Sequence, residues 1–183
     1  MRVIAGALGG RRLVAPKGLV TRPTGERVRE ALFSILGPLG GAVVLDLYAG
    51  TGALGIEALS RGASRAVFVE NARPALAALR DNLATLGLGG RAKVVGVDVE
   101  RAAREVDREG PFDLVLADPP WAVVADAARV LARVASSALA AGARVVLEHA
   151  ARDVAPLVAG LSARETRLYG DTAVTVYDRA ETP

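Results

Sequence analysis

An α/β fold, with a mostly parallel sheet covered by helices on both faces, is the architecture that this sequence predicts. Short apolar segments alternate with segments of helical periodicity along the 183 residues, and strands that are apolar on both faces are typical of parallel sheets. A glycine-rich run follows the first of these strands, as in nucleotide-binding folds. Only Gly170 and Asp171 separate the last two strand-like segments, which predicts a hairpin and an antiparallel strand at the C-terminus.

The N-terminal region has the pattern of an arm that precedes the sheet. Apolar stretches on both sides of a glycine-rich turn predict a short hairpin or extended arm over 2–14. A proline-punctuated loop follows, and Thr24 is expected to cap a helix over about 26–36. We therefore expect two parts, a basic arm over 1–23 and a single domain over 24–183.

The remaining elements follow in strict alternation and complete a seven-stranded sheet. Strands are expected over 42–48, 65–70, 92–97, 112–118, 143–149, 164–169 and 172–178. Further helices are expected over about 53–61, 74–86, 99–108 and 123–139, with a short one near 153–160. In a doubly wound sheet, ligands bind beyond the carboxyl ends of the strands, so those ends hold the candidate site residues.

Composition excludes several classes of protein. Apolar residues make up 51% of the chain and charged residues 23%, the balance of a folded domain. There is no cysteine and only one histidine, so we expect no disulfide, no zinc and no other metal site. No apolar run is long enough to span a membrane, and a cytoplasmic protein is expected. The histidine, His149, is expected to make local hydrogen bonds rather than take part in catalysis.

Positive charge gathers at the N-terminus. Residues 1–30 hold seven basic and two acidic side chains, a net charge of +5, although the whole chain carries only +3. This predicts either a polyanion-binding segment, with Arg11 and Arg12 in contact with RNA, or a solvated basic face without a partner.

The first strand runs into a candidate nucleotide site. Gly50, Gly52 and Gly55 form a G-x-G-x-x-G run between a strand and a helix, where glycine lets the backbone turn tightly and approach a ligand closely. Dehydrogenases use the same run, so it is weak evidence by itself. Tyr48, at the exit of the strand, is expected to line the pocket.

Three successive strands end in carboxylates, which narrows the choice of ligand. Asp46 faces the glycine loop, Glu70 is placed to bind ribose hydroxyls in a bidentate grip, and Asp98, followed by Val99, is placed to accept an adenine amino group. Alternatively, Asp98 caps the next helix, and both roles can coexist. These acids suit a ligand with adenine, ribose and a positively charged tail better than they suit a pyrophosphate.

The fourth strand ends in the most specific motif, Asp118-Pro119-Pro120-Trp121. Two prolines hold the backbone rigid and leave carbonyl acceptors without neighbouring amide donors. The Asp118 side chain and the Pro119 carbonyl can hold the hydrogens of a base amino group and free its lone pair for attack on a sulfonium methyl. Trp121 offers a face on which an unstacked base can stack.

With these motifs in place, the chain resembles the RsmD-type 16S rRNA guanine-N2 methyltransferases over nearly its whole length. The segments that carry the likeness are MRVIAGALGGRRL, TRPTGERVREALFSIL, DLYAGTGALGIEALSRGA, FDLVLADPPW and YGDTAVTVYDR. The resemblance implies a class I (Rossmann-like) methyltransferase domain, S-adenosylmethionine as cofactor, and methyl transfer to N2 of a guanine in 16S rRNA. The expected partner is a small ribosomal subunit or an assembly intermediate of one.

The resemblance also assigns roles to residues of this chain. It implies that the cofactor is bound by Asp46, Gly50, Gly52, Glu70 and Asp98, and that catalysis rests on Asp118, Pro119, Pro120 and Trp121. Tyr48 and Val99 are expected to border the same cofactor. The resemblance also implies that the basic block, with Arg22, Arg27 and Arg29, faces RNA or the rim of the cofactor site, and Lys17 is expected to contact RNA as well. The motif departs from the common form of the family in ending with Trp121 instead of tyrosine.

Three other functions compete with this one. An N6-adenine methyltransferase acting on RNA or DNA would use nearly the same chemistry at Asp118–Trp121. A nicotinamide-dependent oxidoreductase would use the glycine run, but the chain has no Tyr-x-x-x-Lys pair. A non-catalytic RNA-binding module would not need the intact Asp118–Trp121 motif.

Overall fold

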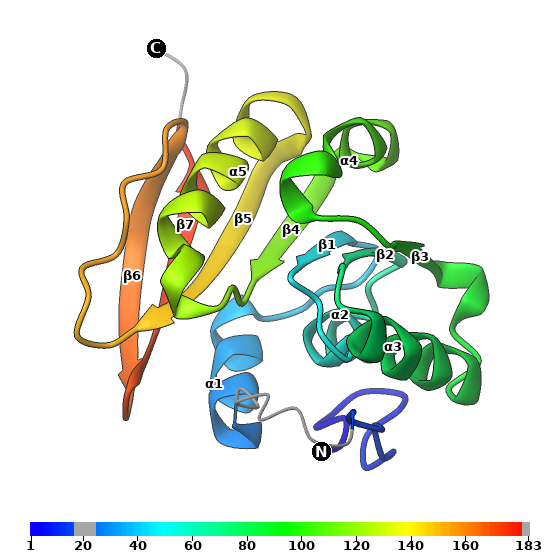
Figure 1. Cartoon of the computed structure of the whole chain (residues 1–183). Coiled ribbons are helices and arrows are strands. Elements are labelled where there is room, and N and C mark those ends of the chain that lie inside the picture. The colour runs from blue at the N-terminus through cyan, green and yellow to red at the C-terminus, as the bar shows by residue number, and fades with distance from the viewer. Residues whose placement is uncertain (17–24, 181–183) are drawn as a thin grey trace.

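The strand ends that carry the candidate residues lie side by side at one end of the sheet, where the parallel strands finish. The computed structural model, which describes residues 1–16 and 25–180, contains a seven-stranded sheet in the order β3-β2-β1-β4-β5-β7-β6 (Figure 1). The strands are β1 (Val43–Leu47), β2 (Arg65–Val69), β3 (Ala92–Val95), β4 (Phe112–Ala117), β5 (Leu139–Ala150), β6 (Leu161–Tyr169) and β7 (Thr172–Arg179). The chain order reverses between β1 and β4, and ligands of such sheets bind outside this switch point.

The predicted strand directions are confirmed. β1 to β5 pair in parallel, and β7 pairs antiparallel with both β5 and β6. The helices are α1 (Glu26–Leu36), α2 (Ala53–Ser60), α3 (Arg73–Thr85), α4 (Ala103–Glu109) and α5 (Val124–Ser137), with short 3-10 helices η1 (Gly89–Arg91), η2 (Val99–Arg101) and η3 (Trp121–Val123).

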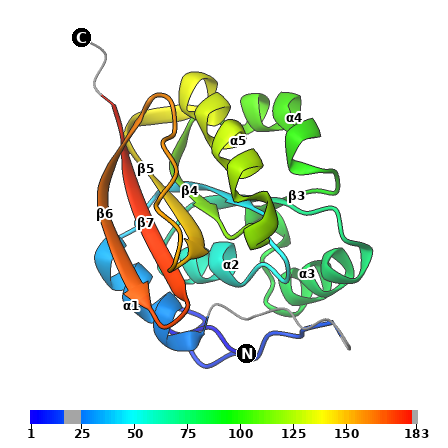
Figure 2. The same cartoon turned by 60° about the vertical axis from the view of Figure 1, so that its left-hand side comes forward.

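Two hydrophobic clusters sandwich the sheet. Alternate strand residues such as Val44 and Phe68 pack with α1, α2 and α3 on one face. Their neighbours, such as Leu45 and Val67, pack with α4 and α5 on the other. Figure 2 shows this division, with α4 and α5 on one side of the strands and α1, α2 and α3 below. The two-sided burial of the parallel strands explains why they read as continuous apolar runs.

The N-terminal arm, defined here as Met1–Val14, forms the predicted hairpin and is bound to the helices. Arg2 and Arg12 form an antiparallel bridge, and Val3 and Leu13 are buried in the cluster below the sheet. The buried carboxylate of Glu57 on α2 accepts the amides of Ile4 at 2.7 Å and Ala5 at 3.0 Å. The arm therefore lies against α1, α2 and α3 (Figures 1 and 2).

The structure corrects the predicted short helix at 153–160. This segment is irregular, and Val154 and Leu157 are 93% and 99% exposed. A helix needs an apolar face to bury and an amide at every interior position, and Pro156 supplies no amide. Its carbonyl instead accepts the Tyr177 hydroxyl at 2.9 Å.

The start of α1 agrees with the prediction, and the start of the helix expected over 99–108 does not. The α1 helix begins at Glu26, with Gly25 at its N-cap and no side-chain cap, and Thr24, the predicted cap, lies outside the described residues. The helix expected over 99–108 begins as η2 and becomes α-helical only at Ala103, because Asp98 caps a single 3-10 turn. None of the described helices is long and apolar enough to cross a membrane.

Candidate active site

The register of the sheet brings the ends of four strands to one level. Leu47 at the end of β1 pairs with Val69 of β2 and Ala117 of β4, and Val69 pairs with Val95 of β3. The residues that follow these positions, including Tyr48, Glu70 and Asp118, therefore leave the sheet together. The four predicted strand-end groups therefore lie at the same end of the sheet, at the switch point where ligands of such folds bind.

The glycine-rich loop after β1 has the backbone that its sequence predicts, with one unexpected member. Gly50 and Gly52 have φ of 56° and 82°, and Tyr48 has φ of 59°. A left-handed conformation costs a residue with a side chain roughly 1–2 kcal/mol. The Tyr48 backbone is therefore strained, and strain of this kind gathers at functional sites.

Asp46 and Gly55 fasten the loop to the sheet. Asp46 is buried, and its carboxylate accepts the Gly55 amide at 2.8 Å. A Cβ at Gly55 would lie 2.3 Å from the Phe68 ring, so the third glycine of the run allows close packing of helix and strand. Burial raises the pKa of Asp46 well above its usual value, and the nearby carboxylates of Asp118 and Glu70 raise it further.

Glu70 is held by backbone amides on both sides. One carboxylate oxygen accepts the amides of Asn71 at 2.8 Å and Ala72 at 2.7 Å, and the other accepts the Gly50 amide at 2.8 Å. A carboxylate offers about four acceptor positions, so roughly one remains open, on the oxygen that faces the glycine loop. The predicted bidentate grip on a ribose is thereby reduced to a single acceptor in this conformation.

Asp98 performs the predicted capping role. One oxygen accepts the Glu100 amide at 3.0 Å, and the other accepts the Asn71 side-chain amide at 3.0 Å. Asn71, which sequence reasoning did not single out, thus joins the acid after β3 to the acid after β2. Its position directly after Glu70 was the available signal. The carboxylate of Asp98 remains exposed for a ligand.

Tyr48 and Val99 lie on the α4–α5 side of this edge. The Tyr48 ring is half-buried, and burial, together with the charges of Asp98, Glu100 and Asp126, raises its pKa to about 12. Its hydroxyl is therefore a hydrogen-bond donor at neutral pH. Val99 is buried and lines a groove with Leu47 of β1 and apolar residues of α4 and α5.

The Asp118–Trp121 segment turns away from β4 directly beside the glycine loop. Pro119 is buried, Asp118 and Trp121 are half-buried, and the Val123 amide closes the turn on the Pro120 carbonyl at 2.9 Å. The Arg152 guanidinium lies 5.9 Å from the centre of the Trp121 ring, within the range of cation–π contacts. Arg152 lies after β5, directly before the segment predicted as a helix, and was not among the predicted site residues.

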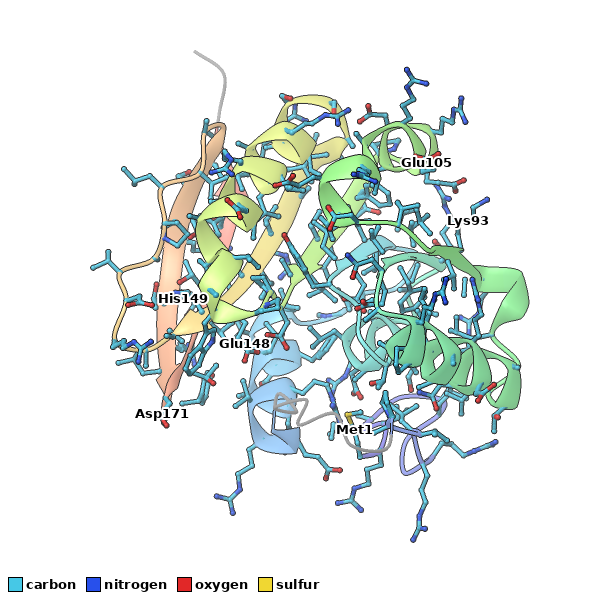
Figure 3. The ribbon with its side chains drawn as sticks, in the orientation of Figure 1. Met1, Lys93, Glu105, Glu148, His149 and Asp171 are labelled. Atoms are coloured by element: carbon cyan, nitrogen blue, oxygen red, sulfur yellow. The ribbon has the colours of Figure 1, made fainter. Side chains whose placement is uncertain are left out.

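The end of β5 and the hairpin tip border the same edge. Glu148, His149 and Asp171 mark these places in Figure 3. His149 is buried, and its ring nitrogens lie 3.1 Å from the Ala150 carbonyl and 2.9 Å from the Thr175 hydroxyl. Since the carbonyl only accepts, the histidine donates to it and receives the hydroxyl hydrogen. The expected local hydrogen bonding of His149 is confirmed.

The basic residues divide into exposed and buried ones. Arg11, Arg12 and Arg27 are exposed. Arg29 is not: it is 1% exposed and donates to the Arg2 carbonyl, and burial lowers the pKa of its guanidinium. The expectation that Arg29 faces RNA is therefore wrong for this conformation, because the arm covers it. Lys17 and Arg22 lie outside the described residues.

The part of the chain that the structure describes contains no cluster of potential metal ligands. No three acidic or histidine side chains there gather closely enough to hold an ion. The strand ends instead carry single carboxylates, and those of Asp46, Glu70 and Asp98 accept backbone amide hydrogens. They suit an organic ligand with hydroxyl, amino and cationic groups.

Comparison with known proteins gives matches over the whole site. The family model described as "Conserved hypothetical protein 95" matches residues 1–178. "Putative rRNA methyltransferase YlbH" of Bacillus subtilis is 45% identical over 123 residues, 66% of this chain and 67% of the relative. "Ribosomal RNA small subunit methyltransferase D" of Escherichia coli is 43% identical over 123 residues, 66% of this chain and 60% of the relative. The alignment with the Escherichia coli relative thus spans about three fifths of its length.

A solved structure extends the likeness to the entire fold. "Putative methyltransferase yhhF from Escherichia coli" is 36% identical, with a TM-score of 0.82 over 98% of this chain and 97% of that one. The predicted class I methyltransferase sheet is thereby confirmed. This chain belongs to the conserved hypothetical protein 95 family, the family of the RsmD-type methyltransferases that its motifs resemble.

Proposed function

We propose that this protein uses S-adenosylmethionine to methylate the exocyclic N2 amino group of a guanine in small-subunit (16S) ribosomal RNA. The observation that carries the proposal is the placement of Asp118-Pro119-Pro120-Trp121 beside the glycine loop, where Ala117 and Leu47 are in register. A base held by the first set of groups would meet a cofactor held by the second. The curated relative from Escherichia coli is named for methylation of small-subunit rRNA, which supports the class of substrate.

The residues fit the proposed cofactor. S-adenosylmethionine supplies a methyl group on a positively charged sulfur. The Asp118 carboxylate lies close enough to Asp46 to interact with it and gives this part of the site a negative potential that favours the cation. The open acceptor position on Glu70 suits a ribose hydroxyl, and Asp98 suits the adenine amino group. Tyr48 and Val99 border the adenine side.

The target base is held by acceptors and by a ring. The Asp118 carboxylate and the Pro119 carbonyl accept the two hydrogens of the amino group, so its lone pair points at the methyl carbon. As the new N–C bond forms, the C–S bond breaks and its electrons stay on sulfur. The amino group then loses a proton to Asp118 or to water. Trp121 stacks on the base, which must first leave its own stack.

The RNA side of the proposal rests on the arm. Arg11 and Arg12 on the arm and Arg27 on α1 are exposed cations, and Lys17 and Arg22 lie between them in sequence. The proposed partner is 16S rRNA within a small subunit or an assembly intermediate, a substrate that would place the protein in the cytoplasm.

The test is methyl transfer from labelled S-adenosylmethionine to rRNA and to small subunits that lack the modification, followed by nucleoside analysis. We expect label in N2-methylguanosine. Asp118→Ala should lower kcat at least about 100-fold, while the affinity for S-adenosylhomocysteine changes little. Asp81→Asn, which alters an exposed carboxylate on α3, is the control for the loss of one charge.

Other outcomes would overturn parts of the proposal. Label in N6-methyladenosine would keep the chemistry and replace the substrate by adenine. Normal methylation by Asp118→Ala would remove Asp118 from the mechanism. Transfer to neither substrate by a protein that binds the cofactor would contradict the choice of rRNA.

A further inference from the structure

Asn82 on α3 joins two parts of the molecule that the proposed function treats separately. The residue is 2% exposed. Its side-chain oxygen accepts the Val14 amide at 2.7 Å, and its side-chain nitrogen donates to the Val14 carbonyl at 3.1 Å and to the Thr51 carbonyl at 3.0 Å. Both hydrogens of the amide group are therefore used, one toward the N-terminal arm and one toward the glycine loop.

The bond to Thr51 holds the centre of the loop. Thr51 stands between Gly50 and Gly52, and the Gly52 amide donates to Ala49 at 2.7 Å. The peptide group that joins Thr51 to Gly52 is thus held at its carbonyl by Asn82 and at its N–H by Ala49. Gly52 on one side of this peptide, and Gly50 one residue before Thr51, leave the loop backbone easy to rotate, so the bond from Asn82 favours one orientation of it.

The bonds to Val14 hold the end of the arm. The Leu13 amide donates to the Met1 carbonyl at 3.0 Å, the last backbone bond described within the hairpin. Val14 follows directly after this bond. Glu57 and Ser60 hold the other end of the arm on α2. Val14 is 56% exposed, and without Asn82 its backbone groups would turn to water.

We propose that Asn82 is a positioning residue that couples the arm to the glycine loop, so that binding of the cofactor and binding of RNA strengthen each other. A cofactor that orders the loop orders the Thr51 carbonyl, then the Asn82 amide, then Val14. Linkage is reciprocal, so RNA that orders the arm raises cofactor affinity by the same factor, and such factors are typically about 5-fold or more. The claim that RNA takes part in this coupling rests on the proposed function. The claim that Asn82 links the arm to the glycine loop does not.

The first experiment needs no RNA. Amide hydrogen exchange of Val3, Gly10 and Leu13, which are hydrogen-bonded within the arm, is measured with and without saturating S-adenosylhomocysteine. In the native protein we expect the ligand to slow their exchange at least about 5-fold. In Asn82→Leu, which removes all three bonds at similar size, the ligand should bind more weakly and leave arm exchange unchanged.

A second variant separates coupling from a loss of stability. Val14→Pro removes the amide that donates to Asn82, leaves the Val14 carbonyl as the one remaining partner of Asn82 on the arm, and keeps the bond from Asn82 to Thr51. We expect S-adenosylhomocysteine affinity within about twofold of native, as the loop side of the link is intact, and clearly less slowing of arm exchange by the ligand than in the native protein. A purely structural Asn82 would lower the unfolding midpoint without changing the effect of the ligand on the arm. Equal slowing in native protein and both variants, or no slowing in the native protein, overturns the proposal.

A third experiment, with RNA, measures S-adenosylhomocysteine affinity with and without small-subunit rRNA. The native protein should bind the ligand at least about 5-fold more tightly with RNA present, and Val14→Pro should show a clearly smaller ratio. The same ratio in both proteins overturns the RNA half of the coupling. A native protein that does not bind this RNA contradicts the proposed function, whereas the exchange experiment still decides whether Asn82 links the two parts.

Discussion

Burial determines the protonation behaviour of Asp46, the acid beneath the glycine loop. Its folded-state pKa is raised because the carboxylate loses water. The unfolded chain therefore releases this proton first, near the ordinary pKa of about 4, while the folded protein keeps it. Between these two pKa values the folded state binds more protons than the unfolded state, so this group lowers the free energy of unfolding as pH rises.

Asp46→Asn tests this sign. Asparagine can still accept the Gly55 amide but cannot titrate, so the variant should gain stability relative to the native protein as pH rises above about 4. The gain is at most about 1.4 kcal/mol per pH unit and stops at the folded-state pKa. Urea unfolding at several pH values between 4 and 8 measures it. A constant difference between the two proteins would contradict the raised pKa.

The half-buried ring of Trp121 allows a second prediction at the scale of single residues, because the proposed function has it stack on the target base. Base stacking is worth about 1–3 kcal/mol, so Trp121→Ala should lower kcat/KM for rRNA by roughly 5- to 150-fold. Trp121→Phe, which keeps a ring, should lose much less. Affinity for S-adenosylhomocysteine should stay near native in both variants and serves as the control for folding. Equal losses in the two variants would mean that the ring does not stack on the base.

At the scale of elements, the arm depends on one close approach to α2. Gly6 has φ of 81°, and a Cβ there would lie 2.0 Å from the Ser60 carbonyl oxygen. Gly10 has nearly the same φ, 82°, but nothing lies within 4 Å of the corresponding position. The two glycines therefore separate backbone strain from collision.

Alanine at each position gives a matched comparison. Gly10→Ala should cost only the left-handed strain, roughly 1–2 kcal/mol. Gly6→Ala should cost more than Gly10→Ala, and it should speed amide exchange of Ile4 and Ala5, whose bonds to Glu57 depend on the same contact. Thermal unfolding and hydrogen exchange measure both. Equal effects would show that the arm can move away from Ser60 at little cost.

The elements also show where sequence patterns stop being informative. Apolar runs and glycine punctuation predicted every strand of the sheet, because burial on two faces leaves a local signature. The segment after β5 gave a false helical signal: its apolar residues Val154 and Leu157 are exposed, and only Val158 is buried. Whether a short apolar segment becomes a helix depends on a surface to cover, and that surface is formed by distant residues.

At the scale of the whole molecule, sequence patterns again reveal what is local and miss what depends on distant residues. The ends of β1 to β4 could be located from local patterns, and parallel topology brings them together. Glu57 and Asn82 contact the arm from 53 and 68 residues away, and nothing in their own neighbourhood marks them. Arg29 was misplaced for the same reason, since its burial depends on Arg2.

Charge distribution over the whole molecule makes the last prediction. The arm and α4 lie on opposite faces of the sheet (Figures 1 and 2). Arg11 and Arg12 on the arm are exposed, as are Arg104 and Arg108 on α4. Phosphate contacts release counterions, so each lost contact reduces the salt slope of RNA affinity by about 0.7–0.9.

Replacing both arm arginines by alanine should weaken RNA binding and reduce this slope by about 1.5. The Arg104→Ala, Arg108→Ala pair removes the same net charge and should leave the slope near native, because long-range attraction to RNA is screened beyond about 10 Å at 0.1 M salt. Affinity measured across a salt series distinguishes them. If both pairs changed the slope equally, RNA would be attracted by net charge alone, and the arm would be a solvated basic face.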